Sequence, residues 1–589
     1  MNSIDAAIVV LYFAIMIGLG FWYQRAAAKN LESYFLGGKR IHWLALAMSG
    51  SVSNFDITGT MWIVALLTLF GMKSMWNHWM WGFLMGAFFL AFMGKWIRRS
   101  GVMTGAEWMV TRFGDGRDGK AARGAYALMA VVTMVGFVGY AFQGIGKFAA
   151  VYVDMDPTVC AIGIFVATTT YVMLGGLYSV VITDVIQTII LTLAAIVIMG
   201  VAYAHVTPEA IANTLPADWS SLAPVWQLDR AQAEKLVGTG YEVYAAFGPL
   251  LIVWVIKGFM LNLGGPAQMY DFQRFLAARD PRDAAKVGAS WSVFLVVRWG
   301  MAMGIALLAI VGINEVSDPE QVMPTVLQNY LPVGIRGVVI AGLLAAFMST
   351  FSSTVNSGAS YIIRDLWQPF VRPHASDRHL IQASYVATIG IVATGTVVGL
   401  KAGSIREVYD WIMGALGAAF VVPNVLRWFW WRLNGTGYAI GTVAGLIASF
   451  VVWWVPEWSP LYIAFPLVSV VSLVATFAGT WLTKPTEEEI LLDFYRNIRP
   501  FGFWGAIRTK VVPTLSPSQL RGEGVGIAVV NTLLGLIAIS SAYLAPMYLV
   551  SHNHSEAAAY SGLAVVAMVV LKYTWYDNLP EAEPVNETS

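Results

Sequence analysis

The segment Ser51–Thr60 carries the clearest chemical signal in the sequence, because it places an acid inside an apolar stretch. Asp56 lies midway along residues 42–71, which are otherwise mostly apolar. An ionised carboxylate at the centre of a bilayer costs roughly 2.5–3.5 kcal/mol, so such a residue usually marks the path of an ion or a substrate. We therefore predict a helix broken at mid-membrane, where free carbonyl groups can coordinate a cation. The alternative is a tilted, continuous helix with one satisfied polar turn.

Residues 345–360 form a second polar stretch that is rich in hydroxyl side chains. Several of its polar residues recur at helical spacing and therefore share one face. They are Ser349, Ser353, Asn356 and Ser360. Small hydroxyl groups also serve ordinary helix packing in membranes, so this stripe alone fits packing and ion binding equally well. Opposite a broken helix, adjacent hydroxyl groups favour a hard cation such as sodium, by extension from the oxygen ligands that calcium and magnesium prefer.

Two further features belong to the same pattern. Asp184 lies near the start of the apolar residues 178–203. It is interpreted either as a helix-start acid that the helix dipole favours or as an inner ligand for an ion. The sequence Gly264-Gly265-Pro266 cannot continue a regular helix and predicts a second break. Interruptions in corresponding spans of two halves indicate an inverted-repeat transporter with a central site.

Lys257 and Arg298 are cations inside apolar stretches. Such residues bind an anionic substrate, pair with an internal acid or extend to the interface. Arg298 lies mid-span, which favours pairing or substrate binding. No Ser-His-Asp arrangement or HExxH motif points to an enzyme, and the phosphate-loop-like residues 114–120 lack the Ser or Thr that nucleotide binding requires. We therefore predict a protein that is not an enzyme.

The composition indicates which elements must position these residues. Of 589 residues, 57% are hydrophobic and 12% are charged, whereas soluble chains are roughly 45–50% apolar and 25% charged. This excludes a soluble enzyme, a disordered chain and a nucleic-acid binder, and the net charge of +1 leaves no dominant basic patch. Fifteen stretches are long and apolar enough to cross a bilayer. They are approximately residues 4–23, 42–71, 74–97, 123–152, 157–174, 178–203, 242–264, 284–312, 335–363, 380–401, 405–431, 436–455, 459–482, 524–550 and 556–574.

The distribution of basic residues predicts the orientation of these stretches. Most of the 36 Lys and Arg residues fall in loops on one side. Since basic loops remain in the cytoplasm, this predicts an outside amino terminus and an inside carboxyl terminus. The expected protein is an all-α polytopic membrane protein of the cell membrane.

Four short motifs occur in order near the ends of these stretches. They are ESYFLGGKR at Glu32–Arg40, a GG…V…TD..Q pattern at Gly175–Gln187, QRFLAAR at Gln273–Arg279, and FWWRLN at Phe429–Asn434 followed by Gly437. Together they resemble the sodium/solute symporter family, which includes sodium/glucose and sodium/proline carriers. The resemblance covers roughly residues 4–482. It implies a LeuT-like fold, in which five helices and their inverted repeat carry extra helices at both ends.

The resemblance, together with the apolar stretches beyond residue 482, implies an organisation of the chain. The expected parts are an extra helix with the first cytoplasmic loop (1–41), a first five-helix repeat (42–203), an external loop (204–241), a second five-helix repeat (242–432), two peripheral helices (433–483), a cytoplasmic segment (484–523), two carboxyl-terminal helices (524–575) and a polar tail (576–589). Short interfacial helices are expected in the external loop and in the cytoplasmic segment.

The resemblance implies residues for sodium as well. For the main site they are the carbonyl groups of Asn54, Ile57 and Ala346 and the hydroxyl groups of Ser349 and Thr350. Some relatives hold a second sodium ion with a span-five acid and two later hydroxyl groups. The corresponding residues here are Asp184, Ser352 and Ser353. We expect one sodium site, and a second where these three residues meet.

The resemblance transfers less directly to the solute site. The predicted cavity is lined by Asp56, Met61, His78, Trp79, Asn262, Arg298 and Asp410. We expect sodium-coupled import of a small polar solute, a sugar or a related organic solute, by alternating access across the lipid bilayer. No nucleic acid and no obligatory protein partner is expected. The alternatives are proton coupling through Asp56 and Asp184, transport of an amino acid or an organic carboxylate, and a membrane sensor.

Overall fold

The chain folds almost entirely into helices, as predicted. The structure, a computed structural model, describes residues 2–27, 36, 41–79, 84–216, 218–266, 269–313 and 318–581. Within these ranges the β pairing is limited to one isolated bridge between Trp430 and Phe503. An apolar chain in a membrane must satisfy its backbone polar groups internally, and a helix does this within a single segment.

The helices follow the apolar stretches of the sequence. The longer ones are α1 (Ser3–Ala27), α3 (Trp43–Asn54), α4 (Ile57–Phe70), α9 (Arg117–Val153), α10 (Pro157–His205), α13 (Phe247–Gly264), α15 (Pro281–Trp291), α16 (Val296–Gly312), α18 (Ile335–Ser360), α20 (Asp377–Lys401), α22 (Gly417–Phe429), α23 (Gly435–Trp454), α24 (Leu461–Leu482), α25 (Glu488–Ile498), α28 (Val525–Val550) and α29 (His554–Thr574). The shorter ones are α5 (Met75–His78), α6 (Met85–Phe88), α7 (Gly94–Arg99), α8 (Trp108–Phe113), α11 (Pro208–Thr214), α12 (Arg230–Glu234), α14 (Phe272–Ala277), α17 (Val322–Tyr330), α19 (Gln368–Phe370), α21 (Ile405–Asp410), α26 (Gly505–Val511) and α27 (Pro517–Leu520). Single turns that matter below are the 3₁₀ turns η6 (Met269–Asp271), η8 (Pro319–Gln321) and η13 (Tyr576–Asn578) and the π-helical turns η4 (Phe89–Met93) and η10 (Trp411–Leu416).

Ten helices of the described chain are long and apolar enough to cross a membrane, or eleven when the bent pair α3 and α4 counts as one span. Two predicted spans, 4–23 and 157–174, correspond to the shorter apolar helices Ser3–Leu19 and Pro157–Thr170. Two others are interrupted by π-helical turns, residues 74–97 by η4 and residues 405–431 by η10. Residues 80–83 lie outside the described ranges, as does most of the first motif at Glu32–Arg40. The count of fifteen stays a prediction.

Helix α10 contains two of the predicted spans. A straight helix of its 49 residues would be about 73 Å long, more than twice the bilayer core of about 30 Å. Both of its ends nevertheless lie beside the short helix α17. Tyr152, just before α10, donates to the Pro324 carbonyl at 3.0 Å, and the ring of His205 lies 5.8 Å from that of Tyr330. The chain therefore turns back within α10, between the apolar stretches Pro157–Thr170 and Val180–His205.

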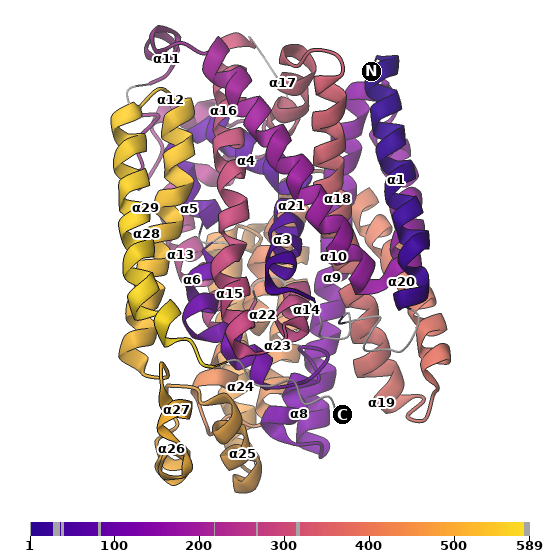
Figure 1. Cartoon of the computed structure of the whole chain (residues 1–589), viewed down its shortest axis with the longest axis vertical. Coiled ribbons are helices and arrows are strands. Elements are labelled where there is room, and N and C mark those ends of the chain that lie inside the picture. Colours follow the sequence, from indigo (N-terminus) through magenta and orange to yellow (C-terminus); the bar gives the residue numbers. More distant parts are fainter. Residues whose placement is uncertain are drawn as a thin grey trace.

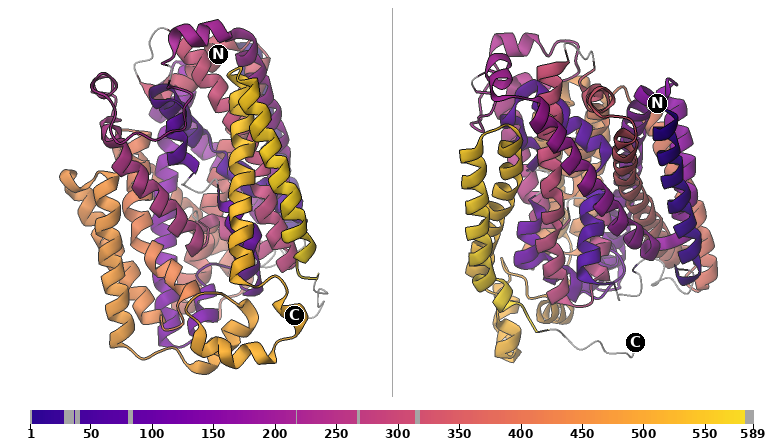
Figure 2. Two further views of the ribbon diagram at one scale, coloured as in Figure 1. Left: turned by 90° about the vertical axis from the view of Figure 1, so that its left-hand side faces the viewer. Right: turned by 45° about the horizontal axis from the view of Figure 1, so that its top comes forward.

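The described chain begins at one end of the bundle and finishes at the other (Figure 1), with α1 at one edge and the α28–α29 pair at the other. Figure 2 shows α28 and α29 side by side and the short helices of residues 484–523 below them. The expected short helices of residues 204–241 are present as α11 and α12. The broken pair α3 and α4 lies inside the bundle, and nearly all residues of α4 are buried.

Candidate functional site

The predicted break in the first long span is confirmed. Helix α3 ends at Asn54, α4 begins at Ile57, and the two are bent by 56°. Asp56 caps α4, because its Oδ1 accepts a hydrogen bond from the Gly59 amide at 2.8 Å. A Cβ atom on Gly59 would lie 2.3 Å from this oxygen, so glycine is needed to make room for the carboxylate. The Asp-Ile-Thr-Gly sequence thus fixes the local geometry of the break.

The guanidinium group of Arg298, on α16, lies against the break between α3 and α4. Its Nη1 donates to the Asn54 carbonyl at 2.6 Å, and its Nη2 lies 3.2 Å from Asp56 Oδ1. Its Nε donates to Thr60 Oγ1 at 3.1 Å. The planar fork of a guanidinium suits such simultaneous contacts. A carbonyl group that the break frees is therefore held by an internal cation, and Arg298 pairs with an internal acid, one of the two roles that its position favoured.

The hydroxyl groups of α18 face the break. Thr350 Oγ1 donates to the Ser53 carbonyl at 2.7 Å and to the Ala346 carbonyl at 3.1 Å. Ser352 Oγ donates to the Ser349 carbonyl of its own helix at 3.1 Å. Ser349 Oγ is buried and faces the Asp184 carboxylate, and it has no other hydrogen-bond partner among the described residues. Its remaining lone pairs are open to a donor or a cation.

Asp184 of α10 is buried beside α3. Its Oδ2 accepts a hydrogen bond of 2.5 Å from Ser49 Oγ, and Arg274 Nη2 lies 3.8 Å from the same oxygen. Arg274 also donates to Ser353 Oγ. The Asp184 carboxylate also faces the Ser349 hydroxyl group, and within the described part of the chain its Oδ1 has no other partner. Arg274 thus brings Asp184 and Ser353 together.

The second predicted interruption is also present. Helix α13 ends at Gly264, where Gly265 has a φ of +124°, and the turn η6 resumes at Met269. This φ lies in the region that favours glycine. Asn54 Nδ2 donates to the carboxylate of Asp271 in η6 at 3.4 Å. The two interruptions therefore adjoin, although they are far apart in the sequence.

A small cavity lies against the first break. It is lined by Asn54, Asp56, Gly59, Trp62, Ile63, His78, Phe137, Tyr140, Arg298 and Tyr409. Its volume of about 20 Å³ holds about one water molecule, so in this conformation it is too small for an organic solute. Three predicted solute residues meet here: Asp56, His78 and Arg298. Neither ring nitrogen of the buried His78 has a hydrogen-bond partner within the described chain.

Aromatic rings form one wall of this cavity. The ring of Trp62 lies 4.4 Å from that of Tyr409, 4.3 Å from His78 and 5.9 Å from Trp254. The ammonium group of Lys257 lies 3.6 Å from the ring centre of Trp254, which is a cation–π contact. Lys257 is therefore held in the protein interior behind the aromatic wall.

The other predicted solute residues lie away from the cavity. Met61 is packed in the core, Trp79 packs against Trp299 at 6.2 Å between ring centres, and Asn262 donates to the carbonyl of its own helix four residues earlier. Asp410 faces an outer pocket. Consecutive helical residues point about 100° apart, so Met61 and Asp410 face away from the cavity that their neighbours Trp62 and Tyr409 line.

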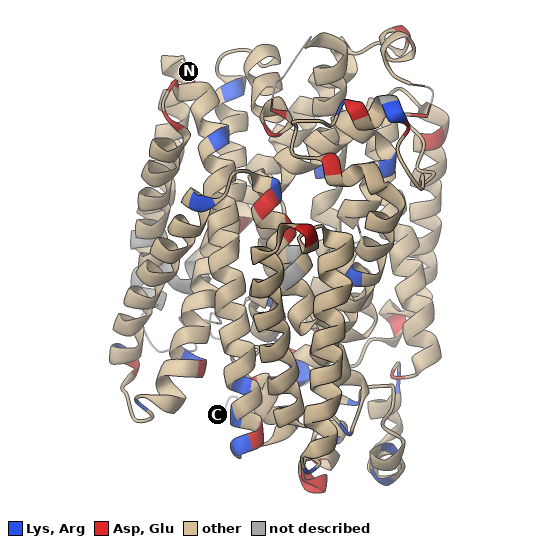
Figure 3. Cartoon of the chain, turned by 180° about the vertical axis from the view of Figure 1, so that it is seen from behind, with Lys and Arg blue, Asp and Glu red and all other residues tan. Residues whose placement is uncertain are grey.

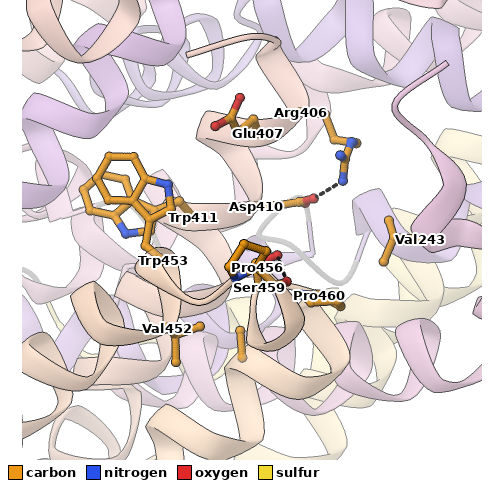
Figure 4. A pocket seen from close by; sticks show the side chains of 11 residues that line it. Val243, Arg406, Glu407, Asp410, Trp411, Val452, Trp453, Pro456, Ser459 and Pro460 are labelled. Carbon is orange, nitrogen blue, oxygen red and sulfur yellow. Dashed lines mark hydrogen bonds and ion pairs between the residues drawn. The ribbon is translucent and has the colours of Figure 1, made fainter. Parts of the chain in front are cut away.

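The outer pocket lies between α21, η10 and the connection from α23 to α24, and its volume is about 390 Å³. Figure 4 shows Asp410 directed at Arg406, with a separation of 2.8 Å between Oδ2 and Nη1. The rings of Trp411 and Trp453 stack at 4.7 Å on the other side. Tyr409, the neighbour of Asp410, lines the central cavity, so this helix separates the two spaces.

Sequence reasoning missed Trp62, Tyr140 and Tyr409. The spacing of Gly59 and Trp62 after Asp56 puts them on one helical face, and this signal was available for Trp62. Tyr140 lies on α9 and Tyr409 on α21. No local sequence pattern reveals that residues so far apart in the chain lie together at the cavity.

Known proteins share this sequence pattern over most of the chain. Residues 34–445 match the sequence model described as the sodium:solute symporter family. The chain belongs to the sodium:solute symporter family. Its relatives include a sodium/glucose cotransporter of Vibrio parahaemolyticus, which is 24% identical over 76% of this chain and 84% of its own length. A sodium/proline symporter of Haemophilus influenzae is 24% identical over 82% and 95%, and a sodium/myo-inositol cotransporter 2 of Bos taurus is 22% identical over 88% and 82%.

The fold agrees with this family. A solved Na⁺-coupled sialic acid symporter superposes with a TM-score of 0.64 and 17% identity, over 82% of this chain and 99% of its own. As a member of the sodium:solute symporter family, the chain is an integral membrane protein and a sodium-coupled transporter. Since the family consists of transporters, the prediction that the chain is not an enzyme is confirmed.

Proposed function

We propose that the chain imports a small polar solute together with sodium, by alternating access around the break between α3 and α4. The observation that carries this proposal is the ion pair of Asp56 and Arg298 at a helix break that faces buried hydroxyl groups. A sugar or a related organic solute is proposed, and an amino acid or an organic carboxylate is the alternative. Lipid surrounds the bundle, and the proposal requires no protein partner.

For the main sodium site we propose the carbonyl groups of Asn54, Ile57 and Ala346 and the hydroxyl groups of Ser349 and Thr350. Support comes from Ser349 Oγ, a buried oxygen that faces the Asp184 carboxylate and keeps lone pairs for an ion. The Asn54 carbonyl already accepts from Arg298. Its second lone pair remains for sodium, so the ion and the guanidinium would share this oxygen.

A second sodium site is proposed at Asp184, Ser352 and Ser353. The buried Asp184 carboxylate, which also faces Ser349 Oγ of the proposed main site, supports it. The buried acids Asp184 and Asp271 and the partly exposed Asp56 accompany the two buried cations Arg274 and Arg298. A monovalent cation balances this excess of negative charge, which buried groups require.

The number of sodium ions that move with each solute molecule sets how far the solute can be accumulated. One charge that moves through 100 mV supplies about 2.3 kcal/mol, and a tenfold gradient adds about 1.4 kcal/mol. One sodium ion therefore supports roughly 500-fold accumulation and two support on the order of 10⁵.

For the topology we propose fifteen spans with the amino terminus outside, and repeats at residues 42–203 and 242–432. Lys and Arg gather mainly at the end of the bundle that carries the carboxyl terminus (Figure 3), which supports an inside location of that end.

Uptake by cells that express the chain tests this function. Labelled sugars, amino acids, carboxylates and nucleosides are screened at fixed pH with sodium and with choline in its place. We expect at least one solute to accumulate only with sodium. Equal accumulation in choline at every pH would contradict sodium coupling, and accumulation that follows the pH gradient instead would assign coupling to protons.

A further inference from the structure

The guanidinium group of Arg274 lies among the residues that are proposed for the second sodium ion. Its Nη2 donates to Ser353 Oγ of α18 and lies 3.8 Å from Asp184 Oδ2 of α10. The same nitrogen donates to Ser49 Oγ of α3 at 3.3 Å. Oxygen atoms from three helices thus surround one positively charged nitrogen. We call Ser49, Asp184 and Ser353 the oxygen cage.

The oxygen cage has the chemistry of a cation site. Its three side chains and Arg274 are buried. Ser49 Oγ donates its proton to Asp184 Oδ2 at 2.5 Å, so this hydroxyl group meets Arg274 with a lone pair. Carboxylate and hydroxyl oxygens are the ligands that hard cations prefer. A sodium ion at Asp184 and Ser353 would therefore need the atoms that the guanidinium group already uses.

Arg274 has a second acid within its reach. Asp271 is buried and lies three residues before Arg274 in the chain, and the positive charge of Arg274 acts on its carboxylate. The hydrogen-bond partner of that carboxylate is the neutral amide group of Asn54, at 3.4 Å. A buried charge is stable when an opposite charge is near. Arg274 can therefore leave Asp184 for Asp271 without losing a counter-charge.

Arg274 and the oxygen cage belong to different parts of the bundle. The cage residues lie on the longer helices α3, α10 and α18, whereas Arg274 lies on the six-residue helix α14. Helix α14 follows the second interruption, where Gly265 has a φ of +124°. Interrupted helices are typical of the ion and substrate sites of transporters. A change in backbone direction at this interruption would move Arg274 relative to the cage.

We propose that Arg274 competes with sodium for the oxygen cage, an inference that rests on the proposed second sodium site. In this conformation the guanidinium group fills the cage. Sodium enters when Arg274 turns toward Asp271, and the return of Arg274 expels the ion and neutralises Asp184 in the empty carrier. Ser49 thereby becomes a further ligand of the second sodium ion.

Sodium binding to the purified full-length protein without solute tests the competition. Radioactive sodium is bound at equilibrium to the wild type, to Arg274→Gln and to Arg427→Gln. A site that an internal group fills nine-tenths of the time binds its ligand about tenfold more weakly. We therefore expect the second site of Arg274→Gln to bind sodium about tenfold more tightly than that of the wild type. Arg427, a buried arginine that bonds to the Gly264 carbonyl outside the cage, is the matched control and should leave sodium affinity unchanged.

Two further readouts separate competition from a purely structural role of Arg274. Uptake by Arg274→Gln should fall although its sodium affinity rises, whereas a loss of structure would lower both. Free guanidinium ion, compared with choline at equal ionic strength, should displace sodium from Arg274→Ala more strongly than from the wild type, because the smaller side chain leaves the cage open to it.

A variant that keeps the pair of Arg274 and Asp184 covers the case in which the Arg274 variants do not fold. Asp271→Asn removes the other acid, so Arg274 should stay in the cage and the second site should bind sodium several-fold more weakly than in the wild type. Wild-type sodium affinity in Arg274→Gln, or in Asp271→Asn where the Arg274 variants do not fold, would overturn the competition. Equal displacement by guanidinium in Arg274→Ala and the wild type would also overturn it. Each of these results would leave sodium-coupled uptake intact, whereas a wild type without sodium-dependent uptake would refute the proposed function itself.

Discussion

Each of the two interrupted spans of this symporter leaves a backbone carbonyl group without its helical partner, and in each span an arginine side chain donates to that carbonyl group. At the first break the Asn54 carbonyl accepts from Arg298 at 2.6 Å. At the second break the Gly264 carbonyl accepts from Arg427 at 3.1 Å and from Trp428 Nε1 at 3.0 Å. In both places an arginine from a later span satisfies a carbonyl group that the broken helix leaves free.

The surroundings of the two arginines differ. Arg298 pairs with Asp56 and lines a cavity. Arg427 lies between aromatic rings, 4.7 Å from the ring centre of Trp108 and 5.1 Å from that of Tyr126. A helix break is therefore not by itself a binding site. We propose a binding site at the first break alone, because it combines a carboxylate, a cavity and facing hydroxyl groups, whereas the second break is enclosed by aromatic packing.

The largest effect is expected for Arg298→Gln. This change leaves the Asp56 carboxylate buried without its partner, which should lower the free energy of unfolding by about 3–5 kcal/mol and abolish sodium-driven uptake. Thermal unfolding of the purified protein and uptake in cells measure the two effects. The double variant Asp56→Asn/Arg298→Gln should regain part of the stability but not the uptake. Wild-type transport by Arg298→Gln would mean that the ion pair has no part in the site.

Asp184→Asn should alter coupling without abolishing transport. The loss of one of two coupled sodium ions lowers the attainable accumulation by roughly 500-fold. Reversal potentials in proteoliposomes measure the ratio of sodium to solute, which should fall from two to one. A wild-type ratio of one would remove the proposed second site.

Arg427→Gln should act on stability alone. It removes the cation–π contacts and weakens the bond to the Gly264 carbonyl, which should cost about 2 kcal/mol. The sodium concentration for half-maximal uptake should stay at the wild-type value in the protein that folds. A large shift in this concentration would show that the second break also takes part in ion binding, and the contrast between the breaks would fail.

The smallest effect is expected for Asp410→Asn in the outer pocket. The Arg406–Asp410 pair is partly exposed, so its loss should cost about 0–1 kcal/mol and change uptake by less than about fivefold. Asp56→Asn measured beside it should abolish uptake. Comparable losses of uptake in both variants would show that Asp410 also takes part in solute transport.

The sequence predicted the features that depend on local chemistry. An acid and a glycine within an apolar stretch predicted the break at Asp56, and Gly-Gly-Pro predicted the interruption after α13. The mid-span position of Arg298 favoured an internal pair or substrate binding over extension to the interface, and the structure shows the internal pair. These predictions succeed because a buried charge or a missing amide proton constrains structure wherever the helix packs.

The features that depend on helix rotation and on distant packing were not predictable in the same way. Met61 was predicted to line the cavity, but its neighbour Trp62 does so. Asp410 was predicted there as well, and Tyr409 takes that place. Each error is one residue along a helix, a rotation of about 100°. The position of Arg274 beside Asp184 follows from the contact of α14 with α3, which no local pattern reveals.

The most direct test measures sodium binding to the purified protein without any solute. Radioactive sodium is bound at equilibrium to the wild type, to Ser349→Ala and to Thr350→Ala, with Ser384→Ala as the control. Ser384 is a buried hydroxyl group on α20 that bonds to its own helix. We predict that both α18 variants lose a saturable sodium site that the wild type and Ser384→Ala retain. Equal sodium binding by all four proteins would contradict the assignment of sodium to the break between α3 and α4.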